Sequence, residues 1–121
     1  MSTAVHDATH LPAKLSELLR SMLEEEFAAQ TVRLTQLTVY ARLPRRGGYD
    51  PRTLRALTAS TRQRIADTAH ALRRMSEGTY GICVSCDKPI PLGRLRAVPH
   101  AAHCALCERT AEPAAREVLS V

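Results

Sequence analysis

The chain has 121 residues, which leaves room for one small domain, or for one long helical element and one compact module, and excludes a large two-domain enzyme. Alanine supplies 18 of its hydrophobic residues, whereas leucine, isoleucine, valine and phenylalanine together number 26, so we do not expect a thick globular core. With no tryptophan, one phenylalanine and three tyrosines, the chain has few rings to stack on nucleic-acid bases.

The formal net charge of +5 comes mainly from arginine, with 15 arginines against two lysines. Nine of these arginines lie between Arg42 and Arg74, where the only acids are Asp50 and Asp67. This density fits either an anionic partner or a solvated helix face, and the sequence does not separate the two. No stretch of about 18 apolar residues is present, and residues 1–12 carry no apolar core of signal-peptide length. We therefore expect a soluble, cytoplasmic protein without a membrane contact.

In chain order, residues 1–10 are expected to be flexible, and the first predicted element is a helix from about Leu11 to Arg42. Pro12 suits a first helical turn, and no further proline or glycine interrupts the run until Pro44. Apolar residues recur at spacings of three, four or seven, which predicts one apolar stripe along this helix. The stripe consists of Leu15, Leu19, Leu23, Phe27, Leu34 and Leu37.

Residues 43–50 are rich in proline, glycine and arginine, and Asp50-Pro51 is typical of an N-cap followed by proline at the first helical position. A second helix is therefore predicted from Pro51 to about Ser76, ended by Gly78. Two long helices with narrow stripes bury them best against each other, which predicts an antiparallel coiled-coil hairpin over residues 11–76 with its tip at 43–51. The second stripe consists of Leu54, Leu57, Thr61, Ile65, Thr68 or Ala69, Leu72 and Met75.

The third segment, residues 77–121, contains all four cysteines, which form two CxxC pairs separated by 17 residues. A two-residue gap lets both thiolates of a pair reach one Zn²⁺ ion, and four thiolates leave no open coordination position for water. The cytosol keeps thiols reduced, so a disulfide framework is not expected. The fold class predicted is thus all-α, a coiled-coil hairpin followed by a C4 zinc finger and a short C-terminal helix. The ligands of the single structural Zn²⁺ would be Cys83, Cys86, Cys104 and Cys107.

Other interpretations of this segment have less support. A thioredoxin-like redox pair would need a βαβ context and would leave the second CxxC without a role. His100 and His103 could in principle replace a cysteine ligand, but with four cysteines present we interpret them as surface residues. The run Glu108 to Leu119 predicts the C-terminal helix, although Pro113 interrupts it. No Ser/His/Asp set, nucleotide-binding loop or open metal site is visible, so we do not expect an enzyme.

The finger segment resembles the TraR/DksA C4 zinc-finger family, and the preceding hairpin with its Asp-Pro turn is similar to the coiled coil of the longer, DksA-like members. The matching residues are GTYGICVSC at 78–86, then Ile90, Arg94, Leu95, Ala97, Pro99, Ala101 and CALC at 104–107. The resemblance implies a transcription factor that binds RNA polymerase directly and modulates initiation. It places the finger at the rim of the polymerase secondary channel and the hairpin tip near the active centre, with no contact to promoter DNA.

The tip of family members usually carries the pattern Asp-x-x-Asp-x-Ala. Here Asp50 matches the first acid, whereas Thr53 replaces the second acid and Arg55 replaces the alanine. The resemblance therefore makes Asp50 the candidate functional acid, while the surrounding arginines leave the activity of this tip open. Candidates for contacts with the partner are Arg45, Arg46, Arg52, Arg94 and Arg96.

Some DksA-like members bind the alarmone ppGpp jointly with polymerase, through basic residues on the second helix and around the finger. The corresponding positions here are Asp67, Val98 and Glu108, none of which is basic. Because two acids repel a highly charged guanosine phosphate, we expect little or no ppGpp synergy. Two alternative functions remain: a zinc-ribbon protein that binds nucleic acid through its Arg-rich helix, and a zinc or thiol redox sensor.

Overall fold

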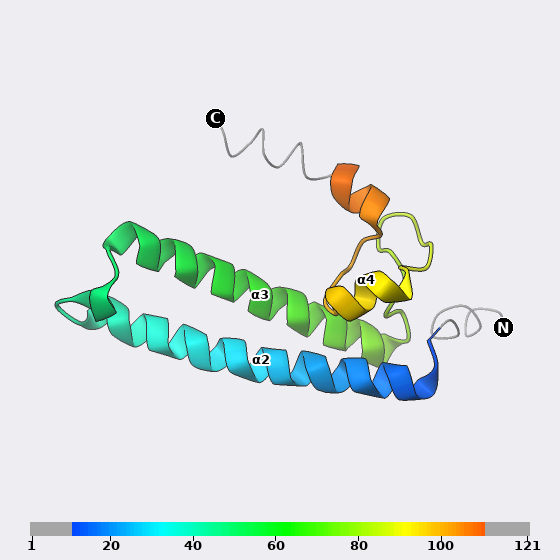
Figure 1. Cartoon of the computed structure of the whole chain (residues 1–121), viewed down its shortest axis with the longest axis horizontal. Coiled ribbons are helices and arrows are strands. Elements are labelled where there is room, and N and C mark those ends of the chain that lie inside the picture. Colours follow the sequence, from blue (N-terminus) through cyan, green and yellow to red (C-terminus); the bar gives the residue numbers. More distant parts are fainter. Residues whose placement is uncertain (1–10, 111–121) are drawn as a thin grey trace.

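The computed structural model describes residues 11–110, and it shows a long helical hairpin with a small module folded against one end (Figure 1). The elements in order are α2 (Ala13–Arg42), the short 3₁₀ helix η2 (Arg46–Gly48), α3 (Pro51–Glu77) and α4 (Leu92–Ala97). Residues 105–110 are also helical, and these elements include no β-strand. The predicted flexible residues 1–10, and the part of the predicted C-terminal helix beyond residue 110, lie outside the described residues.

The long helix α2 begins at Ala13, two residues later than predicted, because Pro12 is extended and serves as its N-cap. It ends at Arg42, where Leu43 leaves the helical conformation. Within the span of the structure, no helix combines the length and the apolar character needed to cross a bilayer. The long run without glycine or proline thus forms one uninterrupted helix of 30 residues.

The apolar stripe of α2 is narrower than predicted. Leu19, Leu23 and Leu37 are at most 1% exposed, but Phe27 is 37% exposed, so its assignment to the buried stripe was wrong. At about 100° per residue, Leu37 returns to the direction of Leu19, whereas Phe27 is roughly 80° away from it. A hairpin of two helices covers only a narrow strip of each surface, and Phe27 lies beyond its edge.

The helix α3 begins at Pro51, as predicted, and ends at Glu77, one residue beyond the predicted Ser76. Asp50 is its N-cap, Pro51 occupies the first turn, and Gly78 closes the helix in the left-handed conformation with a φ of 81°. One residue of α3 that was not predicted to be buried, Ala71, is 0% exposed. Its small side chain lies in the core that α2, α3 and the module share.

Two threonines of α3, Thr61 and Thr68, lie buried in the seam between the helices. Their hydroxyls donate hydrogen bonds of 2.7 Å to the carbonyls of Leu57 and Arg64, four residues back along the same helix. A buried hydroxyl without a partner would cost free energy, and these bonds remove that cost without any group from α2.

The module after α3 is fixed to the open end of the hairpin by a shared core. Its buried members come from α2 and the segment just before it, from α3 and from the module. They are Leu11, Leu19, Leu23, Ala71, Tyr80, Cys83, Ile90, Leu95 and Ala101. Because residues of the hairpin and of the module exclude water from one another, the orientation of the module relative to the helices is set by packing. The predicted fold class, a helical hairpin followed by a small cysteine-containing module, is confirmed.

Candidate metal centre

The first cysteine pair lies on a tight loop that closes on itself. Ile82 and Pro89 form an isolated antiparallel bridge, and the backbone N–H of Cys83 donates a 2.8 Å hydrogen bond to the carbonyl of Lys88. The N–H of Asp87 returns a 2.9 Å bond to the carbonyl of Cys83. This backbone network places both thiols of the pair on the same side of the loop.

The second pair lies at the start of the helix over residues 105–110. The N–H of Glu108 donates to the carbonyl of Cys104 at 2.9 Å, which forms the first turn and brings Cys104 and Cys107 together. The two pairs are joined by a 2.9 Å bond from the N–H of Val84 to the carbonyl of Ala102. Local turns therefore build each pair, and this backbone contact helps to hold the pairs together.

All four thiol sulphurs lie within 4.8 Å of one another, and the Sγ atoms of Cys86 and Cys104 are 3.8 Å apart. Four thiolates around Zn²⁺ at about 2.3 Å would be separated by about 3.8 Å, so the arrangement has the size of a zinc tetrahedron. The same separation is far too long for a disulfide, and all four cysteines are free. The predicted ligands Cys83, Cys86, Cys104 and Cys107 are thus brought into one cluster.

The thiols also have the electrostatics of a cation site. Burial raises the pKa of Cys83, but hydrogen bonds from backbone N–H groups, that of Cys104 foremost, outweigh it and lower the pKa to about 6. A hydrogen bond with Cys104 raises the pKa of Cys107 to about 12. Metal ligands are thiolates, so the binding of a divalent cation at this cluster is coupled to the loss of the thiol protons. This cluster is a structural Zn²⁺ site.

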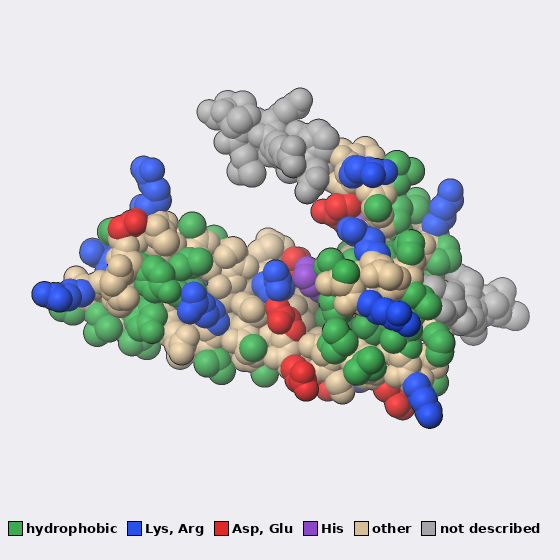
Figure 2. All heavy atoms as spheres, viewed as in Figure 1, with side chains coloured by type: hydrophobic (Ala, Val, Ile, Leu, Met, Phe, Trp, Pro, Cys, Tyr) green, Lys and Arg blue, Asp and Glu red, His purple; other side chains and the backbone are tan. Residues whose placement is uncertain are grey.

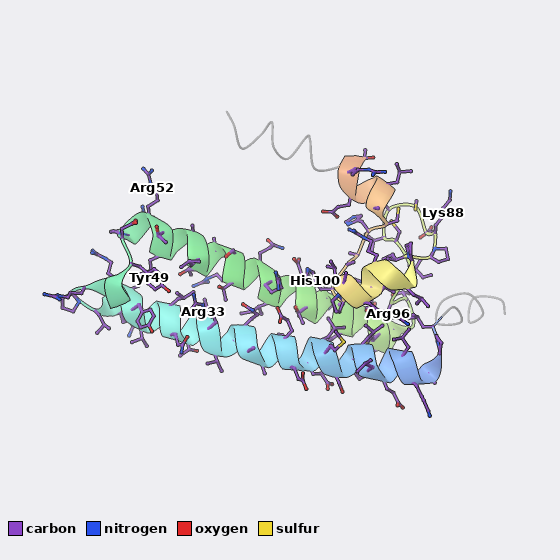
Figure 3. The ribbon with its side chains drawn as sticks, in the orientation of Figure 1. Arg33, Tyr49, Arg52, Lys88, Arg96 and His100 are labelled. Carbon is purple, nitrogen blue, oxygen red and sulfur yellow. The ribbon has the colours of Figure 1, made fainter. Side chains whose placement is uncertain are left out.

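His100 and His103, which could in principle replace a cysteine, are not part of the four-thiol cluster. The carbonyl of His103 instead accepts a 2.9 Å hydrogen bond from Nε of Arg94, whose guanidinium also lies 3.9 Å from the carboxylate of Glu108. Arg94, a predicted partner contact, is therefore engaged within the module itself. Arg96, on the same helix α4, is exposed (Figure 3).

The remaining candidates lie at the opposite end of the molecule, where Figure 3 shows Tyr49 and Arg52 at the tip. Arg45, Arg46 and Arg52 are all exposed there. Asp50 accepts hydrogen bonds from both the N–H and the hydroxyl of Thr53, so its carboxylate already has an intramolecular role. The hairpin thus separates the cysteine cluster from the tip by its whole length.

Three positions singled out by the family resemblance, Asp67, Val98 and Glu108, come together although they are distant in sequence. They share a cavity of about 300 Å³ between α3 and the module. The cavity is also lined by Arg94, His100, Ala101, Ala102 and His103. The structure therefore makes these positions one surface, with acids and bases in close proximity.

An apolar cavity of about 540 Å³, which was not predicted, lies beside the tip. Arg55 and Arg62 both line it, with Leu54 between the helices. The seven-residue spacing of these two arginines, which places them on one helix face, was a signal available from the sequence. The contribution of Ala41 from α2 was not, because it depends on how the helices pack.

Similarity to known proteins is found first in the cysteine-containing segment. A family model described as the prokaryotic dksA/traR C4-type zinc finger matches residues 78–113. An uncharacterized protein of Aquifex aeolicus is 44% identical over 48 residues, which cover 40% of this chain and 33% of that protein. General stress protein 16O of Bacillus subtilis is 42% identical over 40 residues, which cover 33% of this chain and 24% of that protein. The chain thus matches a third or less of the length of these relatives.

The whole fold also has a counterpart. The structure of transcription factor DksA2 from Pseudomonas aeruginosa aligns with a TM-score of 0.70, covering 93% of this chain and 95% of that one. The sequence identity over this alignment is 22%, so the likeness establishes a shared fold. The match over residues 78–113 shows that the cysteine-containing segment is similar to the dksA/traR C4-type zinc finger, and the four-cysteine cluster has the geometry that such a finger requires.

Proposed function

We propose that this protein is a DksA-type transcription regulator that binds RNA polymerase directly and reaches into its secondary channel with the hairpin tip. The observation that carries the proposal is a finger of this family packed rigidly onto the base of a long helical rod. The 27 residues of α3 extend for about 40 Å, so a partner bound at the finger would receive the tip at a fixed depth.

In this proposal the two ends have different tasks. The finger end, with the exposed Arg96, supplies affinity for polymerase, and the tip around Asp50 supplies the effect on initiation. Arg94 is a weaker candidate for the contact than Arg96, because its guanidinium is already bound to His103 and lies near Glu108. The tip differs more from the family pattern than the finger does. Thr53 stands where family members usually have a second acid, and its hydroxyl donates a hydrogen bond to Asp50.

We further propose that ppGpp adds little to the activity. Asp67 and Glu108 line one cavity, and their carboxylates would repel a guanosine tetraphosphate. In an initiation assay, the effect of the protein with ppGpp should equal the product of their separate effects. A response well beyond that product would contradict this part of the proposal.

The main test is purification of the zinc-loaded protein from its own cells, with core polymerase subunits as the expected partners. The Cys104→Ser variant, which loses a zinc ligand, should lose them. A variant in which a short Gly-Ser turn replaces residues 44–50 should retain them but no longer alter initiation in vitro. Failure of the zinc-loaded protein to bind purified core polymerase would overturn the proposal, and loss of binding by the tip variant would show that the tip is the anchor.

A further inference from the structure

Positive charge is concentrated in the distal half of the hairpin. Residues 27–66 contain eight arginines and a single acid, Asp50, for a net formal charge of +7, while the rest of the chain has a net charge of −2. Among the described residues, only Arg64 of these eight forms an ion pair, at 2.7 Å to Glu26. Within residues 11–110, the other seven form no ion pair, and six of them are exposed.

Some of these arginines lie around an apolar groove near the tip. The cavity beside the tip has a volume of about 540 Å³, and the side chains of Arg46, Arg55 and Arg62 line it together with apolar ones. Figure 2 shows the same alternation, with a hydrophobic patch near the tip and basic side chains around it. The apolar lining includes Ala41, Leu54 and Ala59.

One of these arginines is held in an unfavourable backbone conformation. Arg46 has a φ of 48°, the left-handed region that a side chain with a Cβ rarely adopts. Its N–H donates to the carbonyl of Leu43 and its carbonyl accepts from Tyr49, both at 3.1 Å, so the turn fixes it there. A glycine would adopt this φ without strain, as Gly47 does next to it. An arginine therefore occupies a position in the groove wall where the backbone favours glycine.

The groove is better suited to a polypeptide than to a nucleic acid. Binding of single-stranded bases relies on free aromatic faces, and the two tyrosines of the tip are engaged with each other at a ring separation of 6.0 Å. Phosphates would meet the arginines but would gain nothing from the apolar lining, whereas an apolar side chain would be desolvated by it.

We propose that the distal end of the hairpin binds an acidic segment of a partner protein, with one or two apolar side chains of that segment in the groove and its carboxylates against Arg46, Arg55 and Arg62. Charge complementarity selects the segment, and the groove fixes its register. The inference does not depend on the proposed function, because the groove and its charges belong to the hairpin itself and the test contains no polymerase.

The test measures binding of fluorescein-labelled probes to the full-length, zinc-loaded protein by fluorescence anisotropy. The first probe is a peptide of about twelve residues, rich in Asp and Glu, with two leucines spaced as on one helix face. The second is the same peptide with both leucines replaced by serine, and the third is an oligo-dT of equal charge. The leucine peptide should bind at least about ten-fold more tightly than either of the others.

Two double variants with the same change in net charge separate the groove from general attraction. Arg55→Glu with Arg62→Glu should weaken binding of the leucine peptide by at least about ten-fold, whereas Lys14→Glu with Arg20→Glu, near the base of the rod, should change it by less than about two-fold. Arg55 and Arg62 are both exposed, so glutamate at these positions buries no charge and the first variant should remain folded.

Arg46→Gly is a variant that should remain folded, because glycine adopts the left-handed conformation at that position without strain. We expect it to keep its thermal midpoint and to bind the leucine peptide less tightly. The inference would be overturned if the leucine and serine peptides bound equally well, or if oligo-dT bound as tightly as the leucine peptide. Equal losses of binding in the two double variants would overturn it as well.

Discussion

Asp50 binds the start of α3 through both of its carboxylate oxygens. Oδ1 accepts a 2.9 Å hydrogen bond from the N–H of Thr53, and Oδ2 accepts a 2.8 Å bond from the hydroxyl of the same residue. The backbone N–H of Thr53 is the largest cause of a pKa of Asp50 below its ordinary value. The residue proposed to act on a partner is therefore also the cap of the helix that presents it.

Substitution at Asp50 separates these two roles. Asparagine caps a helix about as well as aspartate, whereas alanine leaves the N–H of Thr53 without an acceptor. Asp50→Ala should therefore lower the thermal unfolding midpoint followed by circular dichroism, and Asp50→Asn should leave it nearly unchanged. If Asp50→Asn also retains full activity in an initiation assay, Asp50 is a structural cap alone; a folded but inactive Asp50→Asn protein would assign the function to its charge.

The cap also predicts a pH dependence with a definite sign. Since the folded pKa of Asp50 is lowered from 3.8, its contribution to stability is complete above that ordinary value and is lost as pH falls through the lowered pKa. Unfolding measured from pH 7 to pH 2 should show the wild type losing stability relative to Asp50→Asn in the acid range. An unchanged difference between the two proteins across this range would contradict the assignment.

At the scale of elements, the seam between α2 and α3 depends on a few leucines spaced for a narrow contact. Leu23 is 1% exposed and Phe27, one turn later, is 37% exposed. Leu23→Ala should cost about 3 kcal/mol in the free energy of unfolding, because it leaves a cavity. Phe27→Ala should cost less than about 1 kcal/mol, because its ring is on the rim. Urea unfolding of the two variants compares them directly, and a similar cost for both would mean that Phe27 belongs to the core.

The tip depends on a contact between a ring and a backbone. A Cβ on Gly47 would lie 2.7 Å from the ring of Tyr40, and the φ of Gly47 is 62°. Gly48 has a φ of 90° but open space around it. Gly48→Ala should therefore cost about 1 kcal/mol from its backbone alone, and Gly47→Ala should cost more. Equal unfolding midpoints for these matched variants would show that the ring moves aside without a penalty.

At the scale of the whole molecule, the metal and the base of the hairpin support the same core. Removal of zinc by a chelator should unfold residues 79–108, because the four thiols that the metal joins lie on separate loops and the free energy of metal binding is coupled to the folding of such small modules. Leu19 and Leu23 would then lose part of their cover, since they share one buried cluster with Ile90 and Leu95.

Hydrogen exchange can follow this expectation along the chain. After chelation, the finger amides should lose protection completely, the amides at the base of α2 and α3 partially, and those near the tip hardly at all. The Cys104→Ser variant should reproduce this gradient without a chelator. Protection of the finger that persists in metal-free protein would show that its fold does not need zinc.

The features that could be predicted from the sequence alone are those that depend on residues close to one another in the chain. The spacing of Cys83, Cys86, Cys104 and Cys107 defined the zinc cluster, because each CxxC pair is built by its own turn. Asp50-Pro51 and Gly78 defined the ends of α3 through backbone preferences that neighbouring residues do not change.

Features that need two distant segments were decided only by the tertiary structure. The exposure of Phe27 and the burial of Ala71 depend on how wide a strip each helix covers on the other. The engagement of Arg94 with His103 and the groove formed by Ala41 with Arg55 depend on which side chains meet across the fold. Periodicity in one chain segment indicates which residues share a face, but only the packing of that face against another decides what is buried, paired or left free to bind.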